Sequence, residues 1–91
     1  MLYFIRTEES IKIGISSDPT TRYRAIRTSC PTPCELILTV RCKDDYDAEN
    51  KMHHALRSYR REGEWFNVSF THALNTLMKI NVIDDILQPV L

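Results

Sequence analysis

Two strand-like runs near the start of the chain, residues 2–6 and 11–16, are joined by a short polar link, and this pattern predicts a β-hairpin. Residues 2–6 are rich in strand-forming side chains, and residues 11–16 place three isoleucines on one face and polar residues on the other. We therefore predict two antiparallel strands with an apolar face in the core. The alternation leaves the register open, so either Tyr3 or Phe4 shares a face with Lys12.

The next predicted elements are a helix and a third strand. The helix begins at Asp18-Pro19, with an acid in the N-cap position and proline at the first helical position, and runs to about Thr28. Prolines then interrupt the chain, and the long apolar centre of residues 35–42 predicts a strand in the middle of a small sheet. The side chains expected to face inward from this helix are Tyr23 and Ile26.

A second helix is expected to begin at Asp44 or Asp45 and to end at Gly63, because glycine is typical of helix C-termini. Its apolar residues recur at helical spacing and form a core-facing stripe. The members of this stripe are Ala48, Met52, Ala55, Leu56 and Tyr59. The adjacent stripe, one position round the helix, consists of Glu49, His53, Arg57 and Arg60.

The rest of the chain predicts a short strand over residues 65–68 and a C-terminal helical extension over residues 69–91. Ser69 or Thr71 caps the third helix, and a further helical turn follows it before Pro89. The side chains expected to face inward from the third helix are Ala73, Leu74, Leu77 and Met78.

These elements together define a fold class. In chain order they read β-β-α-β-α-(β)-α, which predicts an α+β fold with a three-stranded antiparallel sheet flanked by helices. A chain of 91 residues is too short to divide its core in two, so residues 1–91 are expected to form a single domain.

The composition limits the classes of function. Twelve Lys and Arg residues balance twelve Asp and Glu residues, so a uniformly basic surface for nucleic acid is excluded, although arginines cluster locally. Three cysteines, and no apolar run of about 20 residues, predict a reduced, cytoplasmic protein without a membrane span. Cys30 and Cys34 have the spacing of half a metal site, but the sequence has no second pair.

Several motifs in the N-terminal half resemble those of the GIY-YIG nuclease superfamily. Residues 1–5 match the first motif at Tyr3, and residues 12–14, Lys-Ile-Gly, match the second motif at its last two positions. Arg22 lies eight residues past the second-motif glycine, where this superfamily carries an arginine. Glu49 stands on the helix after the third strand, where the superfamily carries its metal-binding glutamate.

The resemblance is greatest to a branch that is common in phages and bacterial mobile elements. Members of this branch tend to carry Lys-Ile-Gly in the second strand and a pattern of Glu, His and Gly-Glu-Trp-Phe, which here runs from Glu49 through His53 to Phe66. The resemblance covers about residues 1–68. It implies a metal-dependent endonuclease that hydrolyses phosphodiester bonds in DNA, in the cytoplasm of a bacterial or phage-infected host cell.

The resemblance implies a role for each residue of the expected site. Glu49 would bind Mg²⁺ or Mn²⁺, and Arg22 would contact the scissile phosphate. Tyr3 would act as general base or position the attacking water, and Lys12 would lower its pKa or bind phosphate directly. His53 would be a partner of the metal ligand, a proton shuttle, or a helix-edge residue bonded to the backbone. Apart from the resemblance, Glu49 is explained by a helix N-terminus and Tyr3 by packing of its ring.

Three further arginines, Arg24, Arg27 and Arg57, are candidates for binding nucleic acid. Trp65 and Phe66 are expected in the core, with stacking on a nucleobase as the alternative. Because the chain has no net charge, a DNA-cutting protein of this kind is expected to bind DNA weakly, and oligomerisation or a partner protein could compensate. The alternative function is a catalytically inactive module of the same fold that binds nucleic acid, a nucleotide or a protein.

Overall fold

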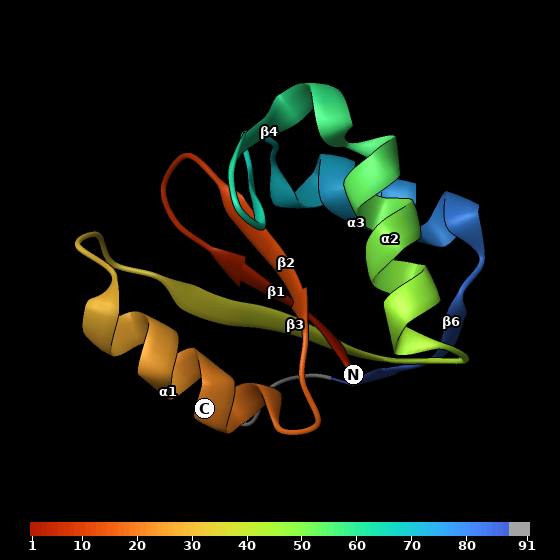
Figure 1. Cartoon of the computed structure of the whole chain (residues 1–91), viewed down its shortest axis with the longest axis horizontal. Helices are drawn as coiled ribbons and strands as arrows, with labels where there is room; N and C mark the ends of the chain where they lie inside the picture. The colour runs from red at the N-terminus through yellow and green to blue at the C-terminus, as the bar shows by residue number, and fades with distance from the viewer. Residues whose placement is uncertain (88–91) are drawn as a thin grey trace.

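A computed structural model describes residues 1–87, which form an α+β fold as predicted (Figure 1). The strands are β1 (Leu2–Arg6), β2 (Ile11–Ile15), β3 (Glu35–Cys42), β4 (Arg60–Glu62), β5 (Trp65–Phe66) and β6 (Ile83–Leu87). The helices are α1 (Pro19–Ser29), α2 (Asp45–Ala55) and α3 (Phe70–Ile80), with a 3₁₀ turn, η1 (Arg57–Tyr59), after α2. Within residues 1–87 the strands form one antiparallel sheet in the order β4-β5-β2-β1-β3-β6. The predicted sheet of three strands was therefore wrong, because the observed sheet has six.

The helices begin at the predicted N-cap signals. The carboxylate of Asp18 accepts a hydrogen bond of 3.2 Å from the Thr21 N–H at the start of α1. Asp44 caps α2 and Ser69 caps α3 in the same way, so these two residues are the caps among the alternatives that the sequence left open. In the part of the chain that the structure describes, no helix is long and apolar enough to cross a membrane.

The second helix is shorter than predicted and does not end at Gly63. Helix α2 ends at Ala55, and after η1 the chain enters a hairpin made of β4 and β5. Gly63 forms the turn of this hairpin with a φ of 54°, and its carbonyl accepts a hydrogen bond of 2.7 Å from Arg60 Nε. The left-handed backbone that favours glycine occurs at hairpin turns as well as at helix ends, so the glycine alone did not distinguish them.

The segment after α3 is a strand, and the predicted further turn of helix was wrong. Asn81 at the C-cap of α3 adopts the left-handed conformation, with a φ of 54°, which stops the helix and turns the chain. Residues 83–87 then pair antiparallel with the outer edge of β3. Pro89, which was expected to end the helical extension, lies outside the described residues.

The register of β1 and β2 decides which side chains share a face of the sheet. Tyr3 lies opposite Gly14 and Ile5 lies opposite Lys12, so Tyr3 and Lys12 point to the same face and Phe4 points to the other. Helix α1 covers the face of Tyr3, and helices α2 and α3 cover the face of Phe4 (Figure 1). Strand β1 is therefore buried on both faces.

The larger core lies between the sheet and helices α2 and α3, where Met52 and Phe66 are fully buried. Three side chains that were expected to face this core are exposed instead, namely Ala55, Tyr59 and Met78. Tyr59 leaves the core because α2 ends at residue 55 and Tyr59 lies in η1, whereas Ala55 is exposed on the last turn of α2 itself. Met78 follows the buried Leu77 and is rotated about 100° round the helix from it.

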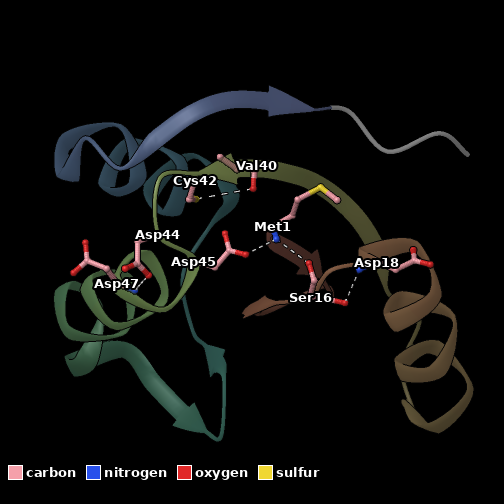
Figure 2. A network of polar contacts seen from close by, with 8 residues as sticks. All are labelled: Met1, Ser16, Asp18, Val40, Cys42, Asp44, Asp45 and Asp47. Atoms are coloured by element: carbon pink, nitrogen blue, oxygen red, sulfur yellow. Dashed lines mark hydrogen bonds and ion pairs between the residues drawn. The ribbon is translucent and has the colours of Figure 1, made fainter.

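A network of polar contacts ties the first residue to the ends of neighbouring elements (Figure 2). The amino group of Met1 donates hydrogen bonds of 2.8 Å to the carbonyl of Ser16 and 2.7 Å to the carboxylate of Asp45. The hydroxyl of Ser16 accepts a hydrogen bond of 3.0 Å from the backbone N–H of Asp18. These contacts hold β1 beside the segments where α1 and α2 begin.

Two methionines provide a matched test of this packing. Met52→Ala should lower the free energy of unfolding by about 2–5 kcal/mol, because Met52 is fully buried and its loss leaves a cavity. Met78→Ala should change it by no more than about 0.5 kcal/mol, because Met78 is 56% exposed. Urea denaturation followed by circular dichroism measures both. Equal losses in the two variants would contradict the assignment of helix faces.

Candidate active site

The candidate site lies at the edge of β2, where its pairing with β5 stops. Strand β5 pairs with β2 only at Ile11 and Lys12. At the next residue, the Ile13 N–H donates a hydrogen bond of 3.0 Å to the Glu64 carbonyl, and the Ile13 carbonyl lies 2.8 Å from His53 Nε2. Because a carbonyl oxygen only accepts, Nε2 carries the proton, and Nδ1 keeps a free lone pair in the neutral ring. A backbone hydrogen bond was one of the alternatives for His53.

Gly14 makes room for two functional groups at this edge. A Cβ atom on Gly14 would lie 2.6 Å from the hydroxyl oxygen of Tyr3 and 2.8 Å from Oε1 of Glu64. Both distances are far below ordinary van der Waals contact, so any side chain at this position would displace one group or the other. Because Gly14 has no side chain, the phenol of Tyr3 and the carboxylate of Glu64 can both lie over β2.

Three side chains at the site could together hold a metal ion. Glu49 and His53 come from successive turns of α2, and Glu64 comes from the turn between β4 and β5. Each offers one ligand atom, and these three atoms all lie within 4.8 Å of one another. Among residues 1–87, no other group of three acidic, histidine or cysteine side chains comes this close together. Oε2 of Glu49 is buried and has no hydrogen-bond partner. A buried, unpartnered carboxylate oxygen beside a second carboxylate and an imidazole fits a divalent cation.

Two basic side chains border these acids. Lys12 Nζ lies 3.3 Å from Oε1 of Glu64 and 5.5 Å from the ring centroid of Trp65. Arg22, in the first turn of α1, is exposed and acts on the phenol of Tyr3 by hydrogen bonding and by its charge. The site thus contains two carboxylates that face one another and two cations at its border.

Burial and neighbouring charges raise the pKa of two groups at the site. Burial raises the pKa of the Tyr3 phenol, hydrogen bonding to Arg22 opposes this rise, and the charges of Glu64 and Glu49 add to it. Burial also raises the pKa of the Glu49 carboxyl, with the neighbouring Glu64 carboxylate adding to the rise and His53 and Lys12 opposing it. Both shifts favour the neutral form of the group more than water does, and positive charge entering the site would oppose them.

The structure brings five of the expected site residues to one place and leaves three elsewhere. The five are Tyr3, Lys12, Arg22, Glu49 and His53. Arg24 and Arg27 are exposed on α1, and the Arg27 guanidinium lies 5.4 Å from the ring centroid of Tyr23. Arg57 is exposed in η1, where its Nη1 donates a hydrogen bond of 2.7 Å to the His54 carbonyl. Because α2 ends at residue 55, Arg57 does not continue the stripe of Glu49 and His53.

Sequence reasoning missed Glu64 as a site residue. The Gly-Glu-Trp-Phe motif was interpreted as a helix stop followed by core aromatics. The available signal was the conjunction of a turn residue, Gly63, with an acid directly after it. Only the hairpin of β4 and β5 returns that acid to the edge of β2 beside Glu49.

Comparison with known protein families identifies the family to which the chain belongs. The model of the T5orf172 domain matches residues 1–87, so the chain belongs to the T5orf172 domain family. This phage-associated domain falls within the group of GIY-YIG- and HNH-like nucleases. The match extends beyond residues 1–68 and includes α3 and β6. Searches of curated proteins and of solved structures gave no significant match.

The pKa of Glu49 predicts how stability depends on pH in the presence of a chelator. A carboxyl whose pKa is higher in the folded state binds its proton more tightly there, so the folded state loses stability as pH rises from the ordinary value of 4.5. Glu49→Gln should remove this loss and exceed the parent in free energy of unfolding at about pH 8, but not at about pH 4. Urea denaturation in EDTA at both pH values measures the difference. The exposed Glu62→Gln is the control and should follow the parent; identical curves for all three proteins would refute the burial of Glu49.

The two glycines of the chain provide a second test. In a strand, Gly→Ala ordinarily stabilises by about 0.5–1 kcal/mol, but Gly14→Ala should lower the free energy of unfolding by about 1–3 kcal/mol because its Cβ meets Tyr3 and Glu64. Gly63→Ala should cost about 1 kcal/mol through its left-handed φ alone, since no atom lies within 4 Å of the added Cβ. Thermal and urea denaturation measure both. Stabilisation by Gly14→Ala would mean that the phenol and the carboxylate do not meet over β2.

Proposed function

We propose that this protein is a metal-dependent endonuclease of the GIY-YIG type that hydrolyses phosphodiester bonds in DNA and belongs to phages or mobile elements. The observation that carries the proposal is the meeting of Tyr3, Glu49 and Glu64 at the open edge of β2, with Arg22 beside them. Phosphodiester hydrolysis needs an oriented water and positive charge near the phosphoryl oxygens. The groups at this edge can orient the water and can hold a cation that supplies the positive charge.

The residues present fit a divalent cation. Glu49 would be the principal ligand, and Glu64 and His53 Nδ1 would complete the protein's share of the coordination. Two carboxylates suit Mg²⁺ and Mn²⁺ alike, whereas the imidazole suits Mn²⁺ better. When bound, such a cation would neutralise charge on the phosphoryl oxygens and assist departure of the leaving oxygen.

Arg22 and Lys12 would position the substrate. The exposed guanidinium of Arg22 can donate to two non-bridging oxygens of one phosphate, which places the phosphorus beside the phenol of Tyr3. Lys12 is only 14% exposed and is paired with Glu64, so its role is to offset the carboxylates and to attract the phosphate as a point charge.

Tyr3 would orient the attacking water. With its raised pKa the phenol stays protonated, and its oxygen can accept a hydrogen bond from water while its proton is directed elsewhere. Deprotonation becomes easier when the charges of Glu49 and Glu64 are neutralised, because these charges help to raise the pKa. His53 is held by the Ile13 carbonyl, so its Nδ1 keeps a constant orientation.

A catalytically inactive nucleic-acid-binding module is the second candidate function. Two observations favour it. The pKa of Tyr3 is raised rather than lowered, which is the wrong direction for a general base. Lys12 is engaged with Glu64 instead of being free for phosphate. Because the chain has no net charge, a second copy or a partner protein would strengthen DNA binding in either function.

Plasmid cleavage tests the proposed function. The protein should nick or linearise supercoiled DNA in Mg²⁺ or Mn²⁺ and lose this activity in EDTA. Glu49→Ala and Tyr3→Phe should each lower the cleavage rate by at least about 100-fold, because each removes a group at the reacting phosphate. Asp84→Ala, at an exposed carboxylate on β6 at the opposite edge of the sheet, should cleave at the parental rate.

The outcomes separate the two candidate functions. Undiminished cleavage by Glu49→Ala would exclude the metal assignment. Absence of cleavage by the parent on supercoiled, single-stranded and branched DNA, with binding retained, would instead support the inactive binding module.

A further inference from the structure

A pocket of about 550 Å³ adjoins the candidate active site on the face of the sheet that α1 covers. Its walls come from the turn between β1 and β2, the C-terminal end of α1 and the hairpin of β4 and β5. This volume lies within the range of pockets that bind small organic groups. The charged and aromatic side chains that line it include Glu8, Glu9, Lys12, Arg61, Glu62 and Trp65.

Trp65 gives the pocket an aromatic wall. The sequence suggested that Trp65 and Phe66 lie together in the core, but the structure separates them. Phe66 is fully buried among α2 and α3, whereas Trp65 is half-buried on the opposite face and lines the pocket. A partly accessible indole in a pocket is a surface on which a flat ring can stack.

Lys12 connects the pocket with the active site. Its Nζ lies 3.3 Å from Oε1 of Glu64, which belongs to the candidate metal ligands, and 5.5 Å from the ring centroid of Trp65. Only the side chain of Lys12 therefore separates a ligand group in the pocket from a phosphate at the candidate active site. This separation fits a base and a phosphate of the same nucleic-acid strand.

The charges of the pocket decide which part of a nucleotide it can take. Glu8, Glu9 and Glu62 line it and would repel a phosphate group, while the exposed Arg61 stands at the β4 side. Carboxylates accept hydrogen bonds from the exocyclic amino groups of cytosine and adenine, which thymine lacks. With three carboxylates against the two cations Lys12 and Arg61, the pocket suits a neutral base with an amino group better than a phosphate.

We propose that this pocket binds one unpaired, amino-bearing nucleobase of the DNA strand whose phosphate lies at the candidate active site. The inference rests on the proposed function for the position of that phosphate. A base in a duplex cannot reach an indole inside a pocket without leaving its stack, so the substrate class is single-stranded or locally unpaired DNA. Trp65 stacks on the base, and Glu8, Glu9 and Glu62 select it.

Fluorescence of Trp65 tests the inference directly, because Trp65 is the sole tryptophan of the chain. In EDTA, where no cleavage is expected, a short oligo(dC) should change the emission of the protein in a saturable way. Oligo(dT) of the same length should bind about tenfold more weakly, the ratio that corresponds to about 1.4 kcal/mol. A blunt duplex should leave the emission unchanged, since its bases are stacked.

Variants at Trp65 distinguish stacking from a general electrostatic effect. Binding of dye-labelled oligo(dC), followed by anisotropy, should weaken about tenfold in Trp65→Leu and stay near the parental value in Trp65→Phe, which retains an aromatic ring. Urea denaturation of both variants checks that they fold. Parental affinity of folded Trp65→Leu, or equal emission changes with duplex and oligo(dC), would overturn the inference.

The fluorescence experiment and the plasmid assay test separate claims, and either claim can be wrong without the other. Emission changes with oligo(dC) in a protein that cuts no DNA would support the base pocket and reject the endonuclease. Cleavage of plasmid without any emission change would support the endonuclease and reject the base pocket. Equal affinity for oligo(dC) and oligo(dT) would reject selection by the carboxylates of the pocket.

Discussion

The candidate site depends on how the backbone N–H and carbonyl of Ile13, at the edge of β2, are hydrogen-bonded. A buried backbone N–H and carbonyl must be paired, and β5 is too short to pair with them as a strand. The Glu64 carbonyl pairs with the N–H of Ile13, and the His53 imidazole pairs with its carbonyl. Each partner brings a further group with it, because Glu64 carries its own carboxylate and His53 lies one turn from Glu49. Hydrogen bonding of the Ile13 backbone thus brings the candidate metal ligands close together.

The electrostatic character of the site follows from this arrangement. Glu49 and Glu64 face one another where Oε2 of Glu49 is cut off from water and from any hydrogen-bond donor. Burial and the mutual proximity of the acids raise the pKa of Glu49, and the same charges help to raise the pKa of Tyr3. Lys12 offsets only part of this negative charge. A cation would therefore act on Glu49, Glu64 and Tyr3 together. The proposed metal would in this way affect the protonation of the phenol.

The two faces of the sheet divide the work of the domain. The face of α2 and α3 holds the larger core and supplies stability, with Phe66 fully buried there. The face of α1 carries Tyr3, Lys12 and Trp65, together with the proposed base pocket. Glu49 and His53 reach the site from α2 only because β2 is near the edge of the sheet at this point. Packing and chemistry thus meet at one strand edge.

Local signals in the sequence determined much of this protein. Strand-like patterns located β1 and β2, a long apolar run located β3, and the caps located the starts of α1, α2 and α3. The resemblance to a known family indicated Tyr3, Lys12, Arg22, Glu49 and His53. The tertiary structure decided the register that places Tyr3 with Lys12, the edge strands β4 and β6, and the position of Glu64. Strand pairing is a contact between distant segments, and short strands carry too few residues to show a periodicity of their own. For that reason the sequence could name most residues of the candidate site, but only the folded sheet could add the second carboxylate, Glu64.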